Sequence, residues 1–187
     1  MDVGKTLYVT NRNEWRKWLI KNHNKEKKIW LIYYKKASGK LRIPYNDAVE
    51  EALCYGWIDS TVKSIDEEKF AQRFTPRRST SVLSEMNKER IRRLIKGKKM
   101  TSFGLRAVSH VFYKNKEDKF SISLDIIKVL RGNEQAWKNF QKFSEGYKRV
   151  RIGYIESQRK HNNKMFEKSL QNFIKKTAKN KKFGMVK

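Results

Sequence analysis

One cluster of side chains in this sequence could bind an anion. Asp59 follows Trp57 in the run GWIDS, and Arg73, Arg77 and Arg78 all occur in the run RFTPRR. If the two runs form neighbouring strands, Asp59 and Arg73 can lie across from each other, and the planar guanidinium groups would suit phosphate or carboxylate. The alternative interpretation is a structural ion pair, because such networks also gather charges without catalysis. We predict a ligand-binding groove around these five residues.

A basic tract further along the chain is a second candidate surface. Its cations would line one side of a helix whose other side is apolar. They are Lys88, Arg90, Arg92, Arg93 and Lys96. Contacts of this kind to phosphates give binding that weakens steeply with salt, and without a recognition motif they would read the nucleic-acid backbone rather than its bases. The alternative is that lysine simply fills solvent-facing positions in a chain rich in Lys and Asn.

Other reactive side chains favour structural roles. Cys54 lies in the apolar run ALC, which is typical of a small buried residue, and no motif couples it to a histidine. Asp47, Glu50 and Glu51 are expected near the start of a helix, as solvated acids that complement its dipole; an acid/base or metal role is the alternative. The sequence has no HExxH, P-loop, GxGxxG or GxSxG motif. We expect no metal and no cofactor.

The composition limits the class of protein. The 187 residues carry 45 Lys plus Arg against 19 Asp plus Glu, a formal net charge of +26, so an anionic ligand or a nucleic-acid backbone is a natural partner. Aromatic residues make up 12% of the chain, which is enough bulky apolar material for a packed core. The N-terminus lacks the apolar run of a signal peptide, and no stretch is long and apolar enough to span a membrane, so we expect a cytoplasmic protein. The oligomeric state is left open.

Local patterns indicate which elements position these residues. Asn11, three residues before Glu14, has the spacing of a capping box and predicts a helix over 11–23. A buried strand is expected over 29–36, a helix over 44–56, and a hairpin of strands 57–63 and 69–75. From residue 84 onward, helical periodicity replaces strand signals. The predicted fold is α+β: a small antiparallel sheet with covering helices in residues 1–83, and a helical part in residues 84–187 that packs with it as one unit.

Several runs resemble one known family. The runs EALCYGWIDS and RFTPRR are followed by Ser84 and Asn87, and AWKNFQKFSEGYKRVRIGYIES occurs downstream. Together they resemble the YdeI/OmpD-associated (OmdA) family, also called bacteriocin-protection proteins. Ser79 and Leu83 stand where that family usually has Pro and Trp, which implies a changed pocket if that Trp lines one. The resemblance implies a small protective protein.

Three functions therefore remain as hypotheses. The leading one is a non-enzymatic protective or stress-resistance protein that binds an anionic ligand around Trp57, Asp59, Arg73, Arg77 and Arg78. The first alternative is a nonspecific nucleic-acid-binding protein that uses the basic tract. The second is a small-molecule enzyme that uses Asp59 and Arg73, which would require a concave pocket at those residues.

Overall fold

The computed structural model describes residues 3–112 and 120–184 of the chain. By contacts within the chain it divides into two units, Met1–Val82 with Arg90–Lys116, and Leu83–Glu89 with Glu117–Lys187. The division falls inside helix α3 (Glu85–Lys96). The packing of the two parts as one unit remains a prediction.

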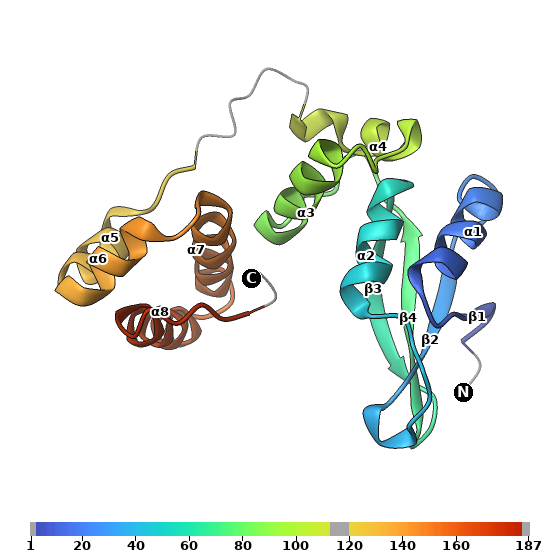
Figure 1. Cartoon of the computed structure of the whole chain (residues 1–187), viewed down its shortest axis with the longest axis horizontal. Helices are drawn as coiled ribbons and strands as arrows, with labels where there is room; N and C mark the ends of the chain where they lie inside the picture. Colours follow the sequence, from blue (N-terminus) through green and yellow to red (C-terminus); the bar gives the residue numbers. More distant parts are fainter. Residues whose placement is uncertain (1–2, 113–119, 185–187) are drawn as a thin grey trace. The chain divides into compact units, whose positions relative to one another are not determined.

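A four-stranded sheet forms the first unit, together with helices on one of its faces (Figure 1). Its elements, in chain order, are β1 (Thr6–Tyr8), α1 (Arg12–Asn22), β2 (Ile29–Tyr34), a short 3-10 helix (Lys36–Ser38), α2 (Tyr45–Cys54), β3 (Trp57–Ser64), β4 (Lys69–Pro76) and α4 (Ser102–Phe112). The strand order is β1-β2-β4-β3. Strands β2, β4 and β3 are antiparallel, as predicted, whereas β1 is a parallel edge strand that was not predicted.

The helices of this unit begin close to where the sequence predicts. Asn11 caps α1 by accepting a hydrogen bond from the backbone N–H of Glu14, and the Glu14 carboxylate accepts one from the N–H of Thr10. Pro44 lies just before α2 rather than inside its first turn. Trp15 of α1 is fully buried and its ring meets Phe74 of β4, so the helices cover one sheet face through large aromatic contacts.

Helix α4 approaches the end of α2 through a glycine. A Cβ atom placed on Gly104 would lie 2.3 Å from the carbonyl oxygen of Cys54, a distance that no side chain tolerates. Thr101, just before α4, donates a hydrogen bond from its hydroxyl to the same carbonyl. A residue without a side chain is therefore required where α4 meets α2.

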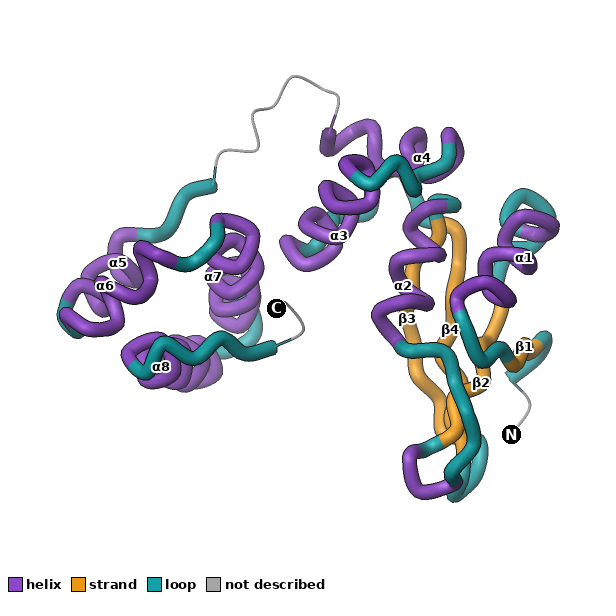
Figure 2. The backbone as a smooth tube through the Cα atoms, in the orientation of Figure 1, coloured by secondary structure: helices purple, strands orange, loops and turns teal. Residues whose placement is uncertain are grey.

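The second unit is helical (Figure 2). It has an apolar core of its own. It contains α5 (Leu124–Arg131), α6 (Glu134–Lys142), α7 (Glu145–Arg159) and α8 (Asn163–Ala178). Asn133 caps α6 and Asn162 caps α8 through side-chain oxygens that accept backbone N–H groups. Phe140 of α6 and Phe173 of α8 meet edge to face in the core. The α+β fold class with a helical C-terminal part is confirmed.

Candidate anion-binding site

Trp57 and Asp59, two of the predicted site residues, have structural partners. Trp57 is 1% exposed and donates its indole N–H to the carbonyl oxygen of His23, at 3.0 Å. Its ring packs edge to face on Trp18, so it belongs to the core beneath α1. The carboxylate of Asp59 accepts a hydrogen bond of 2.6 Å from the hydroxyl of Tyr45, at the start of α2.

The predicted pairing of Asp59 with Arg73 is wrong. Asp59 is paired with Phe74, and since neighbouring residues on a strand point to opposite faces, Arg73 lies on the other face of the sheet. A β-bulge between Asp59 and Val62 causes this, because regular pairing continued from Val62 and Gln72 would have placed Asp59 on the face of Arg73. Arg73 donates instead to the hydroxyl of Ser60, at 2.9 Å.

Arg77 and Arg78 lie beyond the end of β4 in different environments. The guanidinium of Arg77 donates to the carbonyl oxygen of Ser81, at 3.0 Å, and burial lowers its pKa. Arg78 is exposed, as are Ser79 and Thr80 after it. The structure therefore distributes the five predicted residues over the core, both sheet faces and a loop, and the cavity described below is lined by none of them. A function for this group remains a prediction.

The basic tract on α3 is largely engaged within the chain. Arg90 is 5% exposed and donates to the side-chain oxygen of Asn46. Arg93 pairs with Glu50 at 3.3 Å, and Lys88 pairs with Glu85 at 2.6 Å. The remaining predicted cations, Arg92 and Lys96, are half-buried and exposed, respectively.

Glu51, one of the three acids of α2 that were predicted to be solvated, is instead buried, whereas Asp47 lies in the first turn of α2 with a partly exposed side chain. Glu51 is 3% exposed and binds two arginines of α1, Arg12 at 2.9 Å and Arg16 at 2.8 Å. Burial alone would lower the pKa of Arg12, but the carboxylates of α2 around it outweigh burial and raise that pKa. These acids therefore join α1 to α2. Cys54 is fully buried, as predicted, and burial raises the pKa of its thiol to about 11.

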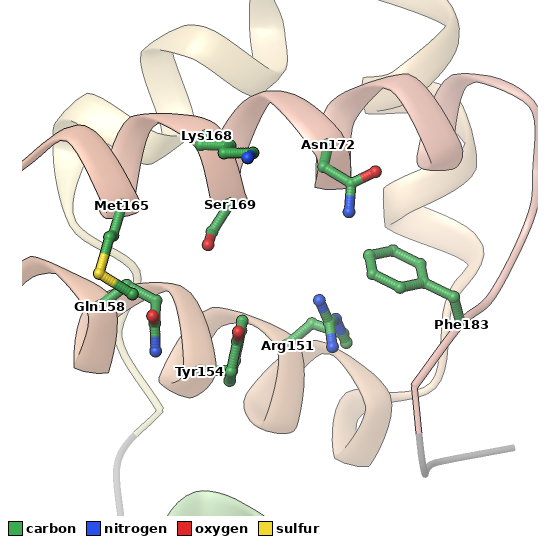
Figure 3. A pocket seen from close by; sticks show the side chains of 8 residues that line it. All are labelled: Arg151, Tyr154, Gln158, Met165, Lys168, Ser169, Asn172 and Phe183. Carbon is green, nitrogen blue, oxygen red and sulfur yellow. The ribbon is translucent and has the colours of Figure 1, made fainter.

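A cavity of about 480 Å³ lies between α7 and α8 of the helical unit (Figure 3). Spacings of three, four and seven residues place its lining side chains on one face of each helix. They are Arg151, Tyr154 and Gln158 of α7, and Met165, Lys168, Ser169 and Asn172 of α8. The turn between the two helices is short: α7 ends at Arg159, and Asn162 caps the start of α8. The two faces are thus held opposite each other as a helical hairpin.

Arg151 is one of the two charged side chains of this lining, with Lys168. Its side chain rises from α7 into the space between the two helices (Figure 3). It is 9% exposed, and its buried Nε atom has no hydrogen-bond partner. Within residues 3–112 and 120–184, no carboxylate lies within ion-pair distance of it. Burial lowers the pKa of Arg151, but a guanidinium stays charged at neutral pH, so the cavity holds an unneutralised cation.

Two aromatic rings flank this cation. The guanidinium carbon of Arg151 lies 4.0 Å from the ring centre of Phe183 and 5.2 Å from that of Tyr154. Phe183 follows α8 and is held in place by its backbone N–H, which donates to the hydroxyl of Tyr147 at 3.2 Å. The rings hold the guanidinium by cation–π contact and provide no anionic oxygen.

The other polar groups of the lining can all donate hydrogen bonds. The hydroxyl of Ser169 and the amide of Asn172 point from α8 toward α7 (Figure 3). Lys168 and Gln158 add an ammonium and a second amide, and the lining includes no Asp, Glu or His. Tyr154 and Met165 are 48% and 49% exposed, so solvent reaches this side of the cavity. A buried cation, amide and hydroxyl donors, and apolar walls together suit a small anion that carries an apolar group.

The sequence contains one signal for this site, which was missed. Tyr147, Arg151, Tyr154 and Gln158 follow one stripe of α7 at helical spacing, beginning with a ring that is 1% exposed. A charged residue inside an otherwise bulky stripe indicates burial with a partner or a ligand. The contribution of Phe183 lies outside any helical period and requires the folded structure.

Across residues 3–112 and 120–184, no group of three or more His, Cys, Asp or Glu side chains is arranged to hold a metal ion. Among the helices in these same residues, none is both long enough and apolar enough to cross a membrane.

Comparison with protein families divides the chain in two. Residues 7–107 match the family described as Domain of unknown function (DUF8412), and residues 119–180 match Bacteriocin-protection, YdeI or OmpD-Associated (OmdA). No curated protein and no solved structure matches the chain. The predicted OmdA resemblance is confirmed by the second match, while the runs EALCYGWIDS and RFTPRR fall within the first. The second match includes every cavity residue except Phe183. Because the first match covers more than half of the chain, the chain belongs to the DUF8412 family, and its residues 119–180 are similar to OmdA proteins.

Proposed function

We propose that this is a protective protein of the bacteriocin-protection type that acts by binding a small anionic ligand in the cavity between α7 and α8. The observation that carries the proposal is the buried guanidinium of Arg151, which is 9% exposed and lacks a carboxylate partner in the described residues. A buried charge without a partner keeps an unfavourable desolvation free energy, which a bound anion would offset by neutralising the charge. The predicted stress-resistance role and cytoplasmic location belong to the same proposal.

The ligand class follows from the lining. The fork of a guanidinium matches phosphate and carboxylate oxygens, and Ser169 and Asn172 supply further donors on the facing helix. Phe183 and Met165 provide apolar contacts for the rest of the ligand. We therefore expect an organic phosphate or carboxylate to bind more tightly than inorganic phosphate.

Binding without catalysis is the simpler function for this cavity. General acid–base chemistry needs a group that can release or accept a proton near neutral pH, and the lining offers no carboxylate or imidazole for that purpose. Lys168 is exposed and Ser169 has no base beside it among the lining residues. The cavity thus supports recognition rather than turnover.

Isothermal titration calorimetry tests this proposal with phenyl phosphate, benzoate and inorganic phosphate, and with benzyl alcohol as a neutral control. We expect both organic anions to bind the wild type and neither to bind Arg151→Met. Arg149→Met is the matched control, because Arg149 lies two residues earlier on α7 and donates to Glu145, at 2.9 Å. Binding that survives in Arg151→Met, or no binding of any anion to the wild type, would overturn the proposal.

Protection can be tested separately in cells. Expression of the wild type in a bacteriocin-sensitive bacterium should raise survival, and expression of Arg151→Met at the same level should not. Equal survival with both proteins would separate protection from the cavity, even if anion binding in solution is established.

A further inference from the structure

The sheet of the first unit has a second face that carries aromatic and basic side chains. Strand pairing places Tyr8, Trp30 and Tyr34 on this face with Lys63 and Arg73, opposite the face that α1 and α2 cover (Figure 1). We call these five residues the open-face patch. An antiparallel sheet with one solvated face usually presents polar side chains there, so three rings on neighbouring strands require an explanation.

Each ring of the patch has cations or another ring beside it. Lys63 Nζ lies 5.5 Å from the ring centre of Trp30, and the guanidinium carbon of Arg73 lies 5.9 Å from it. Tyr8 and Tyr34 meet edge to face with ring centres 5.2 Å apart. Tyr8 is 45% exposed, and Tyr34, Lys63 and Arg73 are half-buried, so solvent reaches the patch.

The charge of the patch is concentrated at the Trp30 end. Lys40 and Lys69, the two lysines near Tyr34, pair with Glu68 at 3.1 Å and with Asp66 at 3.2 Å. In the part of the chain that the structure describes, Lys63 and Arg73 have no carboxylate partner. The lysines beside Tyr34 thus have carboxylate partners, whereas Trp30 lies under two cations that have none.

We propose that the open-face patch binds single-stranded nucleic acid. Bases stack on aromatic side chains, and cations beside the rings contact the phosphates. Trp30 and Tyr34 are four positions apart on β2, or about 13 Å along the strand, which leaves room for two stacking positions. Trp30 is 4% exposed, so Lys63 and Arg73 must move from its ring when a base stacks there, and that movement brings their charges to the phosphates.

A duplex fits this arrangement poorly. Its bases are stacked on one another, and their flat faces are closed to a protein ring without unstacking. The patch therefore predicts a preference for single strands, whereas the basic tract on α3 would contact phosphates of either form. This difference separates the present inference from the general effect of a net charge of +26.

Fluorescence anisotropy with a labelled 20-nucleotide mixed-sequence DNA strand, alone or annealed to its complement, tests the proposal. Three variants are compared with the wild type: Lys63→Glu/Arg73→Glu in the patch, Lys96→Glu/Lys99→Glu as a control of equal charge change, and Tyr34→Leu. Circular dichroism checks that each variant keeps its fold. Lys96 and Lys99 are exposed, which makes them a suitable control pair.

At moderate salt we expect the affinity for the single strand to exceed the affinity for the duplex by about tenfold or more. The charge reversal Lys63→Glu/Arg73→Glu should weaken single-strand binding about tenfold or more. It should also reduce the slope of log affinity against log salt concentration by about 1.4, the value for two lost phosphate contacts. The control reversal should weaken binding less than the patch reversal does. Tyr34→Leu should weaken it by about fivefold or more through lost stacking.

Four results would overturn the proposal: no single-strand binding at low salt, equal affinity for duplex and single strand, an equal effect of the two charge reversals, or wild-type affinity in Tyr34→Leu. None of these results bears on the Arg151 cavity, because the patch and the cavity share no residue.

Discussion

Replacing Arg151 with Met should separate the stability of the helical unit from its ability to bind an anion. The substitution removes a guanidinium that is 9% exposed and has an unpartnered Nε. Removing one partner of a buried ion pair usually costs about 3–5 kcal/mol, because the other charge is left behind. Arg151 has no such partner within residues 3–112 and 120–184, so no charge is left behind there.

The expected magnitude follows from the contacts of Arg151. Its cation–π contact with Phe183 at 4.0 Å is worth about 2 kcal/mol in a desolvated setting, and the longer contact with the half-exposed Tyr154 is worth about 0.5–1 kcal/mol. Against these, the unmade hydrogen bond at Nε costs about 1–3 kcal/mol, and a Met sulfur on the Phe183 ring restores about 0.3–1.5 kcal/mol. We therefore expect the free energy of unfolding of Arg151→Met to lie within about 1 kcal/mol of the wild type.

Urea denaturation followed by far-UV circular dichroism measures the free energy of unfolding of the wild type and of Arg151→Met, with and without phenyl phosphate. At about 100 times its Kd the ligand should stabilise the wild type by about 2.7 kcal/mol, and it should not stabilise Arg151→Met. Arg149→Met should keep the ligand effect, since Arg149 pairs with Glu145. A loss of about 3 kcal/mol or more in ligand-free Arg151→Met would show that Arg151 is a structural residue, and equal stabilisation of both proteins by the ligand would refute the binding role.

Three further substitutions or treatments test the packing of the sheet unit. Gly104→Ala should lower the free energy of unfolding by at least about 1–3 kcal/mol, because the new Cβ would lie 2.3 Å from a backbone oxygen. Gly132→Ala is the control in the same urea assay and should be tolerated, because no atom lies nearer than 3.4 Å to its Cβ position. Glu51→Gln should cost about 2–3 kcal/mol in thermal or urea unfolding, since two arginines lose their buried partner; a cost below about 0.5 kcal/mol would contradict the role of this network. The thiol of Cys54, whose pKa burial raises to about 11, should resist iodoacetamide at pH 8 in the folded protein and react once urea unfolds it; rapid labelling without urea would contradict its burial. The raised pKa also sets the sign of a pH effect: its contribution to stability is complete below the ordinary thiol pKa and declines as the pH rises toward about 11.

Local signals in the sequence predicted most of the fold. The spacing of Asn11 and Glu14 located the start of α1, because a capping box is made by residues three apart and needs no tertiary contact. The alternation and the polar connection of 64–68 located the β3–β4 hairpin. Strand β1 was missed because Thr6–Tyr8 is three residues long and is defined by its pairing with β2, which no local pattern records.

The candidate site was less accessible from the sequence because it depends on distant contacts. One extra residue in β3 moved Asp59 to the face opposite Arg73, and a bulge leaves no clear mark in the sequence. The surroundings of Arg151 depend on Phe183, which lies 32 residues later and beyond the last helix. Register and long-range approach therefore decided which charges meet.

Burial, and not the number of charges, distinguishes a binding site in a chain of this composition. With 45 basic and 19 acidic side chains, 26 cations would lack an acidic partner even if every acid paired once, so an unpaired lysine or arginine at the surface carries no information. Water solvates such a group at little cost, whereas the same group held away from water keeps an unfavourable free energy until an anion arrives. Arg151 meets that condition through burial. Lys63 and Arg73 are only partly held away from water, because each lies over the ring of Trp30. We therefore expect an anionic partner to gain more from binding at these two places than at the basic tract of α3.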